Sequence, residues 1–230
     1  VCQVLLDWGT DAQKSKFLKP LASGLKLGAY SLSEPQSGSD ASNMKTFAEK
    51  NGNNFIVNGT KNWVTSGENS DLIIFFCKTE KGAGSKGISA FIIEKGTPGL
   101  TTGKKEEKLG IRASDTCELY FDNCEIPESN LIGNLGQGFS IAMQALGGGR
   151  IGIASQSVGL ARAALDKTIS YSQEREQFGK TIAKFGAIQN KIADMATNIE
   201  AARLLVMQAA ILKDQGKEYI KESSMAKLFA

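Results

Sequence analysis

Histidine is absent from the 230 residues of this sequence, and cysteine and proline occur only four times each. Without histidine the chain cannot form a Ser-His-Asp triad, a histidine general base or a His-ligated metal site. None of the cysteines (Cys2, Cys77, Cys117 and Cys124) is spaced as CxxC. We therefore expect free thiols and no metal site.

Long hydrophobic runs and an excess of one charge are also missing. The longest apolar run, residues 72–77, has six residues, so we expect no membrane span. The 27 basic and 24 acidic residues give a net charge of +3 without a Lys/Arg-rich run, so we expect no nucleic-acid partner. Contents of 41% hydrophobic and 22% charged residues are typical of a folded globular protein.

The hydrophobic pattern divides the chain into three zones. Residues 1–27 are predicted to be helical, with Gly9 ending one segment and Thr10 capping the next. Residues 28–130 hold short β-prone runs separated by Gly, Asn, Pro and Ser, which predicts an antiparallel barrel or sandwich. Residues 131–230 return to helical spacing. The β-prone runs are residues 29–33, 55–57, 63–65, 72–78, 88–94, 100–102 and 117–121.

The last zone contains two long amphipathic stretches. A helix over residues 185–214 would be roughly 45 Å long at 1.5 Å per residue. Two such helices cannot bury their apolar stripes against each other alone, so we expect further helices, as in a four-helix bundle. The chain begins at Val1 without Met and ends at Ala230 inside a helical pattern, from which we expect a fragment of a longer protein.

Two glycine-containing motifs have simple interpretations. Residues 147–152 fit G-x-G-x-x-G, but a helix rather than a strand is predicted before them, which argues against a Rossmann dinucleotide site. Asn58-Gly59 is predicted to form a turn between two strands rather than part of a glycosylation site.

Three stretches carry side chains suited to bind a ligand. Residues 30–40 are rich in hydroxyls and either present donors to an acceptor-rich ligand or form an ordinary polar loop. Within residues 59–67, Trp63 either stacks on a planar ring beside a threonine hydroxyl or is a core residue. The arginine in residues 175–179 either reaches a phosphate or is a solvated charge at a helix end.

Together these stretches resemble the acyl-CoA dehydrogenase family, and within it the short-chain, butyryl-CoA type, over nearly the whole chain. Several motifs in the family's order carry the resemblance. They are Leu32-Ser33-Glu34-Pro35 with Gly38-Ser39-Asp40, Asn58-Gly59-Thr60-Lys61-Asn62-Trp63-Val64-Thr65, Lys86-Gly87-Ile88-Ser89-Ala90-Phe91, Lys108-Leu109-Gly110-Ile111-Arg112, Gly149-Arg150-Ile151-Gly152-Ile153-Ala154, Arg175-x-x-Phe178-Gly179 and Ala193-Asp194-Met195-Ala196.

The resemblance implies an α+β, multi-domain fold. Residues 1–27 would end an N-terminal helical domain, residues 28–130 would form a central antiparallel β-barrel, and residues 131–230 would begin a C-terminal four-helix bundle. FAD would lie between barrel and bundle.

The resemblance also implies individual roles. Ser33 would bond the flavin ring, Trp63 would pack against it and Thr65 would donate near N5, while Arg175 would reach the FAD pyrophosphate of a neighbouring subunit. The implied cofactor-binding set is Tyr30, Leu32, Ser33, Gly38, Ser39, Trp63, Val64, Thr65, Arg175 and Phe178. The implied set for the CoA substrate is Ser39, Gly147 and Arg150.

The activity implied by the resemblance is α,β-dehydrogenation of an acyl-CoA, as in fatty acid β-oxidation. A carboxylate removes the α-proton, a β-hydride passes to flavin, and electrons continue to an electron-transfer flavoprotein. The implied assembly is a homodimer or homotetramer, in the bacterial cytoplasm or the mitochondrial matrix. A same-fold flavin oxidase, such as a nitroalkane oxidase, and a non-catalytic flavin or acyl-CoA binding protein remain alternatives.

Some positions depart from the family pattern. The usual catalytic Glu lies beyond these residues, and its alternative position is Gly149, so no catalytic base is assigned in this chain. Gly147 and Gly186 replace a common CoA-contacting Asp and flavin-contacting Gln. Because each helix-interior glycine costs about 1 kcal/mol relative to alanine, we expect close approach of a ligand or a neighbouring helix at residues 147–149.

Overall fold

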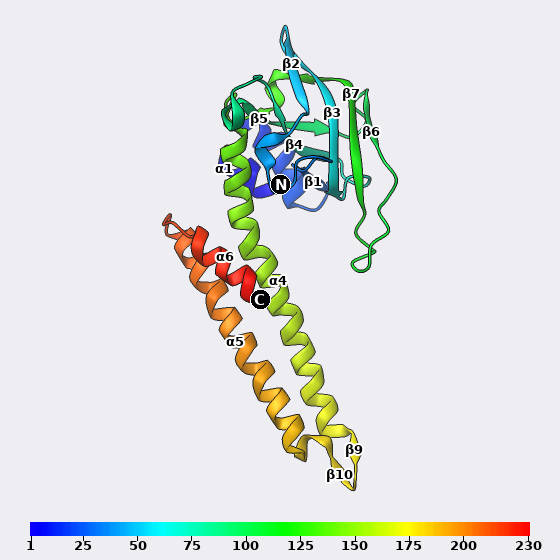
Figure 1. The fold of residues 1–230 in the computed structure, drawn as a ribbon, viewed down its shortest axis with the longest axis vertical. Helices are drawn as coiled ribbons and strands as arrows, with labels where there is room; N and C mark the ends of the chain where they lie inside the picture. The colour runs from blue at the N-terminus through cyan, green and yellow to red at the C-terminus, as the bar shows by residue number, and fades with distance from the viewer. The chain divides into compact units, whose positions relative to one another are not determined.

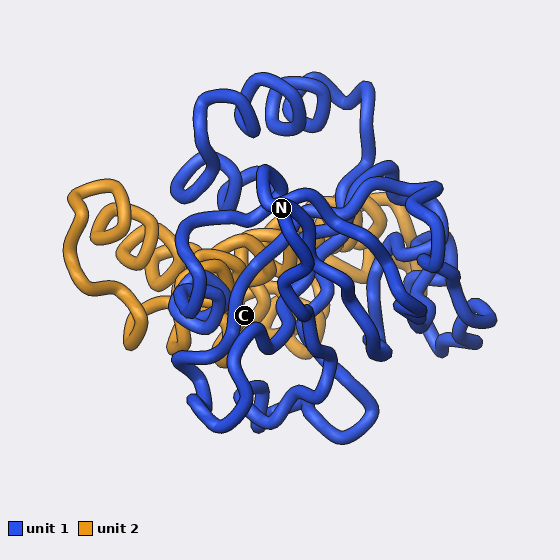
Figure 2. The backbone as a smooth tube through the Cα atoms, turned by 90° about the horizontal axis from the view of Figure 1, so that it is seen from above, with its two compact units in different colours: residues 1–143 blue, residues 144–230 orange.

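An eight-stranded sheet forms most of the first of two compact units in the computed structural model, which describes residues 1–230. The units are Val1–Met143 and Gln144–Ala230, coloured separately in Figure 2. The strand order is β6-β7-β3-β2-β4-β5-β8, and β1 pairs with β4 (Figure 1). The strands are β1 (Gly28–Ser31), β2 (Phe47–Asn51), β3 (Asn54–Thr65), β4 (Leu72–Lys78), β5 (Ile88–Glu94), β6 (Leu100–Thr102), β7 (Thr116–Pro127) and β8 (Leu131–Ile132).

Short helices precede the sheet and join its strands. Thr10 accepts from the N–H of Gln13, whose side chain accepts from the N–H of Thr10, so the predicted cap at Thr10 is confirmed as a capping box. The predicted helix end at Gly9 is confirmed too. The helical segments are α1 (Cys2–Trp8), α2 (Asp11–Gln13), the π-helix η1 (Lys14–Leu18), α3 (Lys19–Ala22) and the 3₁₀ turns η2 (Ala41–Asn43), η3 (Gly84–Gly87) and η4 (Glu128–Asn130).

The core of the sheet unit is aromatic and aliphatic. The ring of Phe75 lies 4.8 Å from that of Phe121, and the ring of Phe55 lies 5.0 Å from that of Phe91. Both β4 and β5 are buried along nearly their whole length, which explains their continuous apolar sequences.

Three details of the sheet differ from the sequence-based prediction. The strand β2 was not predicted, because its residues Phe47–Asn51 are mostly polar and exposed. Asn58-Gly59 is not a turn: it lies inside β3 at a register shift, and the β2–β3 turn lies at Gly52, where φ is +59°. Most strand pairs are antiparallel as expected, but β1 and β2 both run parallel to β4, which is possible because no tight turn joins either of them to β4.

The second unit is helical. Its long helices are α4 (Gly138–Glu174), which begins in the first unit, and α5 (Gly186–Asp214), followed by α6 (Ile220–Phe229). The predicted helix over residues 185–214 is confirmed within one residue at its start. The hairpin β9 (Glu176–Gln177) and β10 (Lys180–Thr181) and the turn η5 (Ile182–Lys184) connect α4 to α5.

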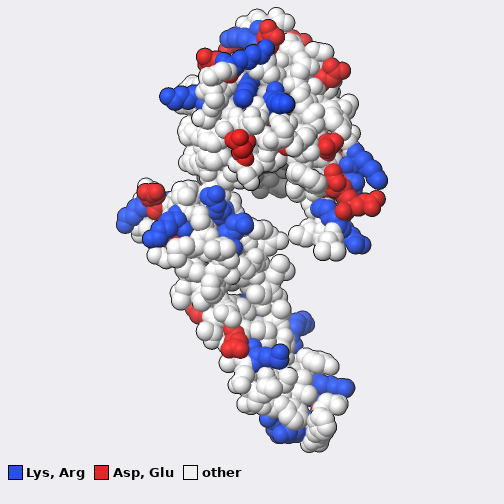
Figure 3. Space-filling view, viewed as in Figure 1, with Lys and Arg blue, Asp and Glu red and all other residues white.

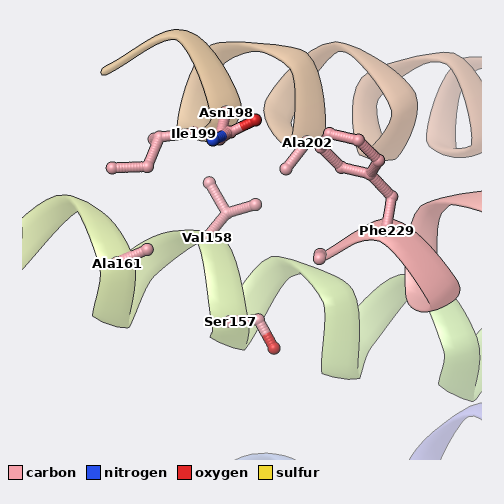
Figure 4. A pocket seen from close by; sticks show the side chains of 8 residues that line it. Ser157, Val158, Ala161, Asn198, Ile199, Ala202 and Phe229 are labelled. Atoms are coloured by element: carbon pink, nitrogen blue, oxygen red, sulfur yellow. The ribbon is translucent and has the colours of Figure 1, made fainter. Parts of the chain in front are cut away.

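Small and branched side chains join the three helices. Ala154, Val206 and Ala226 form the buried centre of their contact. A groove of about 280 Å³ is lined by residues that include Val158, Ile199 and Phe229 (Figure 4). The face of the helical unit drawn in Figure 3 is mostly uncharged. Exposed apolar side chains such as Leu160, Leu204 and Ile211 agree with the expectation that two long helices leave apolar surface uncovered.

One helix has the length and composition that a bilayer crossing requires. This helix is α5, with a mean hydropathy of 1.2 over its most apolar window, of which 17% is buried. Core helices of bundles meet the same criterion. The absence of a membrane span therefore stays a prediction. The longest uninterrupted apolar run does not test it, because a helix can be apolar on average while polar residues interrupt the run.

Candidate functional site

The last residues of β3 alternate between the core and the surface. Trp63 is 65% exposed, Val64 is fully buried and Thr65 is exposed. Both Trp63 and Thr65 are exposed whereas Val64 between them is buried, so the indole and the Thr65 hydroxyl both lie on the outer side of β3. The interpretation of Trp63 as a core residue is thus wrong, and Val64 can meet a ligand only through its backbone.

Backbone strain is concentrated at the same place. Trp63 has φ +58° and Ser66 has φ +61°, in the left-handed region that is uncommon for residues other than glycine. The β3–β7 register shifts between Lys61 and Val64. Each such residue costs about 1–3 kcal/mol and persists where surrounding contacts fix it, often at binding sites.

A tight turn follows β1 and lies beside this strand end. The N–H of Glu34 donates to Ser37 O at 2.8 Å, and the N–H of Ser37 donates back to Glu34 O at 3.0 Å. The N–H of Asn62 donates to Ser33 O at 2.8 Å. The structure therefore brings together two of the three stretches that the sequence predicts to bind a ligand.

The remaining predicted residues of this turn have different exposures. Gly38 and Ser39 are exposed, whereas Leu32 and Ser33 are half-buried. Tyr30 is half-buried, with its ring 5.2 Å from that of Phe76 and its hydroxyl 3.4 Å from Ala142 O. Burial raises the pKa of Tyr30 well above its ordinary value, so this phenol stays protonated.

A buried ion pair joins the turn to β3. The Lys61 ammonium donates to Glu34 Oε1 at 2.8 Å and to Leu32 O at 3.0 Å, and both charged side chains are at most 2% exposed. Burial opposes ionisation of Glu34, but the Lys61 charge and the N–H groups of Lys45 and Thr46 hold the pKa of this carboxyl below its usual value. Burial also lowers the pKa of Lys61, and Glu34 offsets part of that effect.

Asp115 fixes the chain on the other side of Thr65. Its carboxylate accepts from the N–H of Glu68 and from the side chain of Asn69, both at 2.9 Å, and its carbonyl accepts from the N–H of Ser66 at 2.9 Å. Burial opposes ionisation of Asp115, and these hydrogen bonds hold its pKa below the usual range. The exposed Trp63–Thr65 edge is thus anchored at both ends.

This edge fits a flat aromatic group with polar atoms on its rim, such as a flavin. The Trp63 indole offers a ring face, and the Thr65 hydroxyl makes no hydrogen bond within the chain. Asn62 Oδ1, next to Trp63, is one of three buried side-chain polar atoms without a hydrogen-bond partner, along with Ser31 Oγ and Ser70 Oγ, and a ligand would be one explanation for it. The residues present therefore fit the flavin that the sequence resemblance implies.

The cysteines and carboxylates near the core have no catalytic geometry. All four cysteines are free, as predicted, and burial raises the pKa of Cys77 to about 12 and of Cys117 to about 11, so neither forms a reactive thiolate. No group of three or more acidic or cysteine side chains could hold a metal ion. Glu34 and Asp115 are buried in the contacts above, so neither is assigned as a base.

In the helical unit, α4 passes without interruption through the three glycines. A Cβ on Gly147 would lie 2.7 Å from Ile220 Cδ1, so the expected close approach of a neighbouring helix is confirmed there. A Cβ on Gly148 would meet the flexible end of Lys213 at 3.4 Å and the Tyr219 hydroxyl at 4.0 Å, and nothing lies within 4 Å at Gly149. For Gly149, the prediction that a neighbouring helix approaches closely is therefore wrong for the helices of this chain. Arg150, one residue later, is half-buried and makes no ion pair within the chain.

The third predicted stretch forms the hairpin between α4 and α5. Arg175 is exposed, and its carbonyl accepts from the N–H of Ile182 at 2.8 Å. Phe178 is 93% exposed and has φ +53°, followed by Gly179 at φ +74°. An uncovered aromatic residue in a strained turn beside an arginine is a surface available to another molecule.

Two sequence profiles match the chain over most of its length. One, described as "Acyl-CoA dehydrogenase, middle domain", matches residues 29–124, and the other, "Acyl-CoA dehydrogenase, C-terminal domain", matches residues 136–230. The chain belongs to the acyl-CoA dehydrogenase family. The resemblance found in the sequence motifs and the fold that it implied are confirmed.

Individual members of the family are similar over nearly the whole chain. The short-chain specific acyl-CoA dehydrogenase of Rattus norvegicus mitochondria is 49% identical over 226 residues, which are 98% of this chain and 55% of that protein. The butyryl-CoA dehydrogenase structure from Megasphaera elsdenii has 48% identity and a TM-score of 0.95, covering 99% of this chain and 60% of that one.

A further structure comes from work on the electron transferring flavoprotein of Acidaminococcus fermentans. It has 50% identity and a TM-score of 0.96, and it covers 99% of this chain and 60% of that one. The chain thus spans 55–60% of the length of these family members.

The contacts that fix the site were not predicted from sequence. Lys61, Glu34 and Asp115 all lie in or next to motifs that carry the resemblance, but their pairing depends on burial. The available signal for this pairing was a lysine and a glutamate inside otherwise apolar or hydroxyl-rich segments. Charged residues are rarely buried unless they are paired, so two such residues could have been expected to pair.

Proposed function

We propose that the protein carrying this chain is an FAD-dependent acyl-CoA dehydrogenase that converts a short-chain acyl-CoA to the trans-2-enoyl-CoA. Membership of the family and about half-identity to short-chain specific members support this proposal. The observation that carries it is the strained, exposed Trp63 beside the unpaired Thr65 hydroxyl. This edge has the ring face and the donor that a flavin needs.

The residues of the sheet unit would hold and orient the flavin. Trp63 would pack against its ring system, Thr65 would donate to the ring edge, and Ser33 would bond the ring from the neighbouring turn. Gly38 and Ser39, both exposed, leave the end of that turn open to the cofactor and to the CoA substrate. Bound FAD would supply the hydride acceptor.

The helical unit would contribute to the substrate and to a second subunit. Arg150 is a half-buried guanidinium without an ion-pair partner, which suits the phosphates of CoA, with Gly147 on the same helix. Arg175 and Phe178 would contact the FAD of a neighbouring subunit, so the active protein would be a homodimer or homotetramer.

The base that removes the α-proton would lie outside these residues. The developing negative charge on the thioester would need hydrogen-bond donors in a site that excludes water, where such bonds are strongest. Electrons would then pass to an electron-transfer flavoprotein.

The compartment of the protein would be the bacterial cytoplasm or the mitochondrial matrix. The end of the N-terminal helical domain would be residues 1–27, the β-barrel domain residues 28–130 and the start of the C-terminal helical bundle residues 131–230.

The experiment is anaerobic mixing of the purified flavin-containing protein with acyl-CoAs of increasing length. We expect butyryl-CoA to bleach the oxidised flavin band and to yield crotonyl-CoA. A purified protein without flavin, or a flavin that no acyl-CoA bleaches, would contradict the proposal. Rapid reoxidation by oxygen instead of by electron-transfer flavoprotein would favour the alternative of a same-fold oxidase.

A further inference from the structure

We infer that the buried Lys61–Glu34 ion pair is the positioning element that sets the geometry of the flavin-binding edge, a role that rests on the proposed function. Neither residue reaches the surface, so neither touches the cofactor. Both act through the backbone segments that they join.

The pair links three separate segments of the sheet unit. Lys61 lies on β3, two residues before Trp63, and bonds Leu32 O in the turn that contains Ser33. Glu34 belongs to that turn and accepts from the N–H of Thr46, just before β2. The ion pair therefore supports the relative placement of Ser33 and Trp63, together with the hydrogen bond from the N–H of Asn62 to Ser33 O.

The strained backbone at Trp63 needs contacts from other residues to hold it, and the Lys61–Glu34 pair provides one of them. Left-handed backbone is unfavourable for tryptophan, and a side chain that is 65% exposed gains little packing in return. The conformation is held from outside the residue: by Lys61 and the Asn62–Ser33 hydrogen bond before it, and by Asp115 after it. Removing the pair frees one of these two anchors.

The experiment must separate a loss of folding stability from a loss of correct placement of the flavin-binding edge. Lys61→Met leaves the Glu34 carboxylate buried and unpaired, which strongly destabilises a fold. The double variant Lys61→Met/Glu34→Leu removes both charges, so it avoids the cost of a buried, uncompensated carboxylate. It lacks, however, any group that could bond Leu32 O or Thr46 N–H.

The test compares unfolding temperature with the FAD dissociation constant of the purified, flavin-depleted protein. We expect the double variant to melt below the wild type but above Lys61→Met, and to bind FAD about tenfold or more weakly than the wild type, because a misplaced edge loses roughly one good contact. The visible circular dichroism of its bound flavin should also change. Glu34→Gln, which keeps the size and one acceptor, should show a smaller change in the same direction.

The matched control is Lys50→Met, which breaks the exposed Lys50–Glu128 pair of 2.7 Å in the same unit. It should change neither measurement, since exposed pairs contribute little. Wild-type FAD affinity and an unchanged flavin spectrum in the double variant would overturn the inference. If that variant does not fold, the same result for Glu34→Gln overturns it. A wild type that binds no FAD would instead defeat the proposed function.

Discussion

The backbone N–H of Asn62 donates to the carbonyl of Ser33 across 2.8 Å, so the strained end of β3 lies directly against the turn after β1. The two residues are 29 positions apart in the sequence. Their contact places a hydroxyl-rich turn beside an exposed indole and a free threonine hydroxyl. The site that we propose for a flat, acceptor-rich ligand depends on this contact rather than on either segment alone.

Thr65→Val removes the free hydroxyl and keeps the shape of the side chain. Because a net hydrogen bond contributes about 0.5–1.5 kcal/mol, we expect flavin reduction by acyl-CoA to slow by up to roughly tenfold, with acyl-CoA binding nearly unchanged. Single-turnover absorbance measurements give both quantities. Thr101→Val, at an exposed threonine of β6, is the control. Equal reduction rates in wild type and Thr65→Val would rule out this role.

The stability of the sheet unit should depend on pH through Glu34 and Asp115. Both carboxyls have pKa values lowered by folding. Such groups stabilise the fold above the unfolded pKa, about 4, and this stabilisation is lost as pH falls through the folded value. We expect the free energy of unfolding to fall below about pH 4.

Asp115→Asn tests one of these contributions. Its amide can accept from only one of the two donors, so the variant should be less stable than wild type at neutral pH. It should also lose less stability on acidification, since it has no carboxylate to protonate. Urea unfolding at a series of pH values measures both effects. Parallel pH profiles for the two proteins would show that Asp115 does not contribute.

Gly149→Ala should stabilise α4. No atom lies within 4 Å of the added Cβ, and alanine in a helix interior is favoured over glycine by about 1 kcal/mol. Gly147→Ala should lack this gain, because its Cβ would displace Ile220. Denaturant unfolding of the two variants makes the comparison. A Gly149→Ala variant no more stable than Gly147→Ala would contradict it.

Phe178→Asn should relieve the strain in the β9–β10 hairpin. Asparagine followed by glycine is favoured in a two-residue turn with positive φ at both positions, and left-handed backbone costs other residues roughly 1–2 kcal/mol. We expect a higher unfolding temperature together with weaker FAD retention, since the ring proposed to contact the cofactor is lost. Unchanged FAD retention would remove Phe178 from the binding set.

The sequence predicted the order of the elements better than the contacts between them. The caps at Gly9 and Thr10 and the long helix α5 follow from local rules, and so does the apolar strand β4. The strand β2 could not be predicted, because it has the polar composition of a loop and is held by pairing with β3. Asn58-Gly59 was misassigned because a bulge and a turn use the same residues.

The same distinction holds for the site. Trp63 and Thr65 were identified as candidates, but only the exposure of Trp63 in the fold excluded a core tryptophan, and ring stacking stays a prediction. The Lys61–Glu34 pair depends on two segments meeting in the fold, which no local pattern encodes. The close approach of a neighbouring helix was confirmed for Gly147, where α6 packs, but no helix of this chain approaches Gly149, and approach by a ligand there stays a prediction.

The most direct test of the account is the FAD affinity of Trp63→Ala. The side chain is 65% exposed, so its loss should change the unfolding temperature little. Loss of an aromatic contact of about 0.5–1.5 kcal/mol, together with the buried ring area, should weaken FAD binding roughly tenfold. Leu25→Ala, at another exposed apolar side chain, is the control and should bind FAD like wild type. Equal FAD dissociation constants for wild type and Trp63→Ala would contradict the claim that this edge holds the flavin.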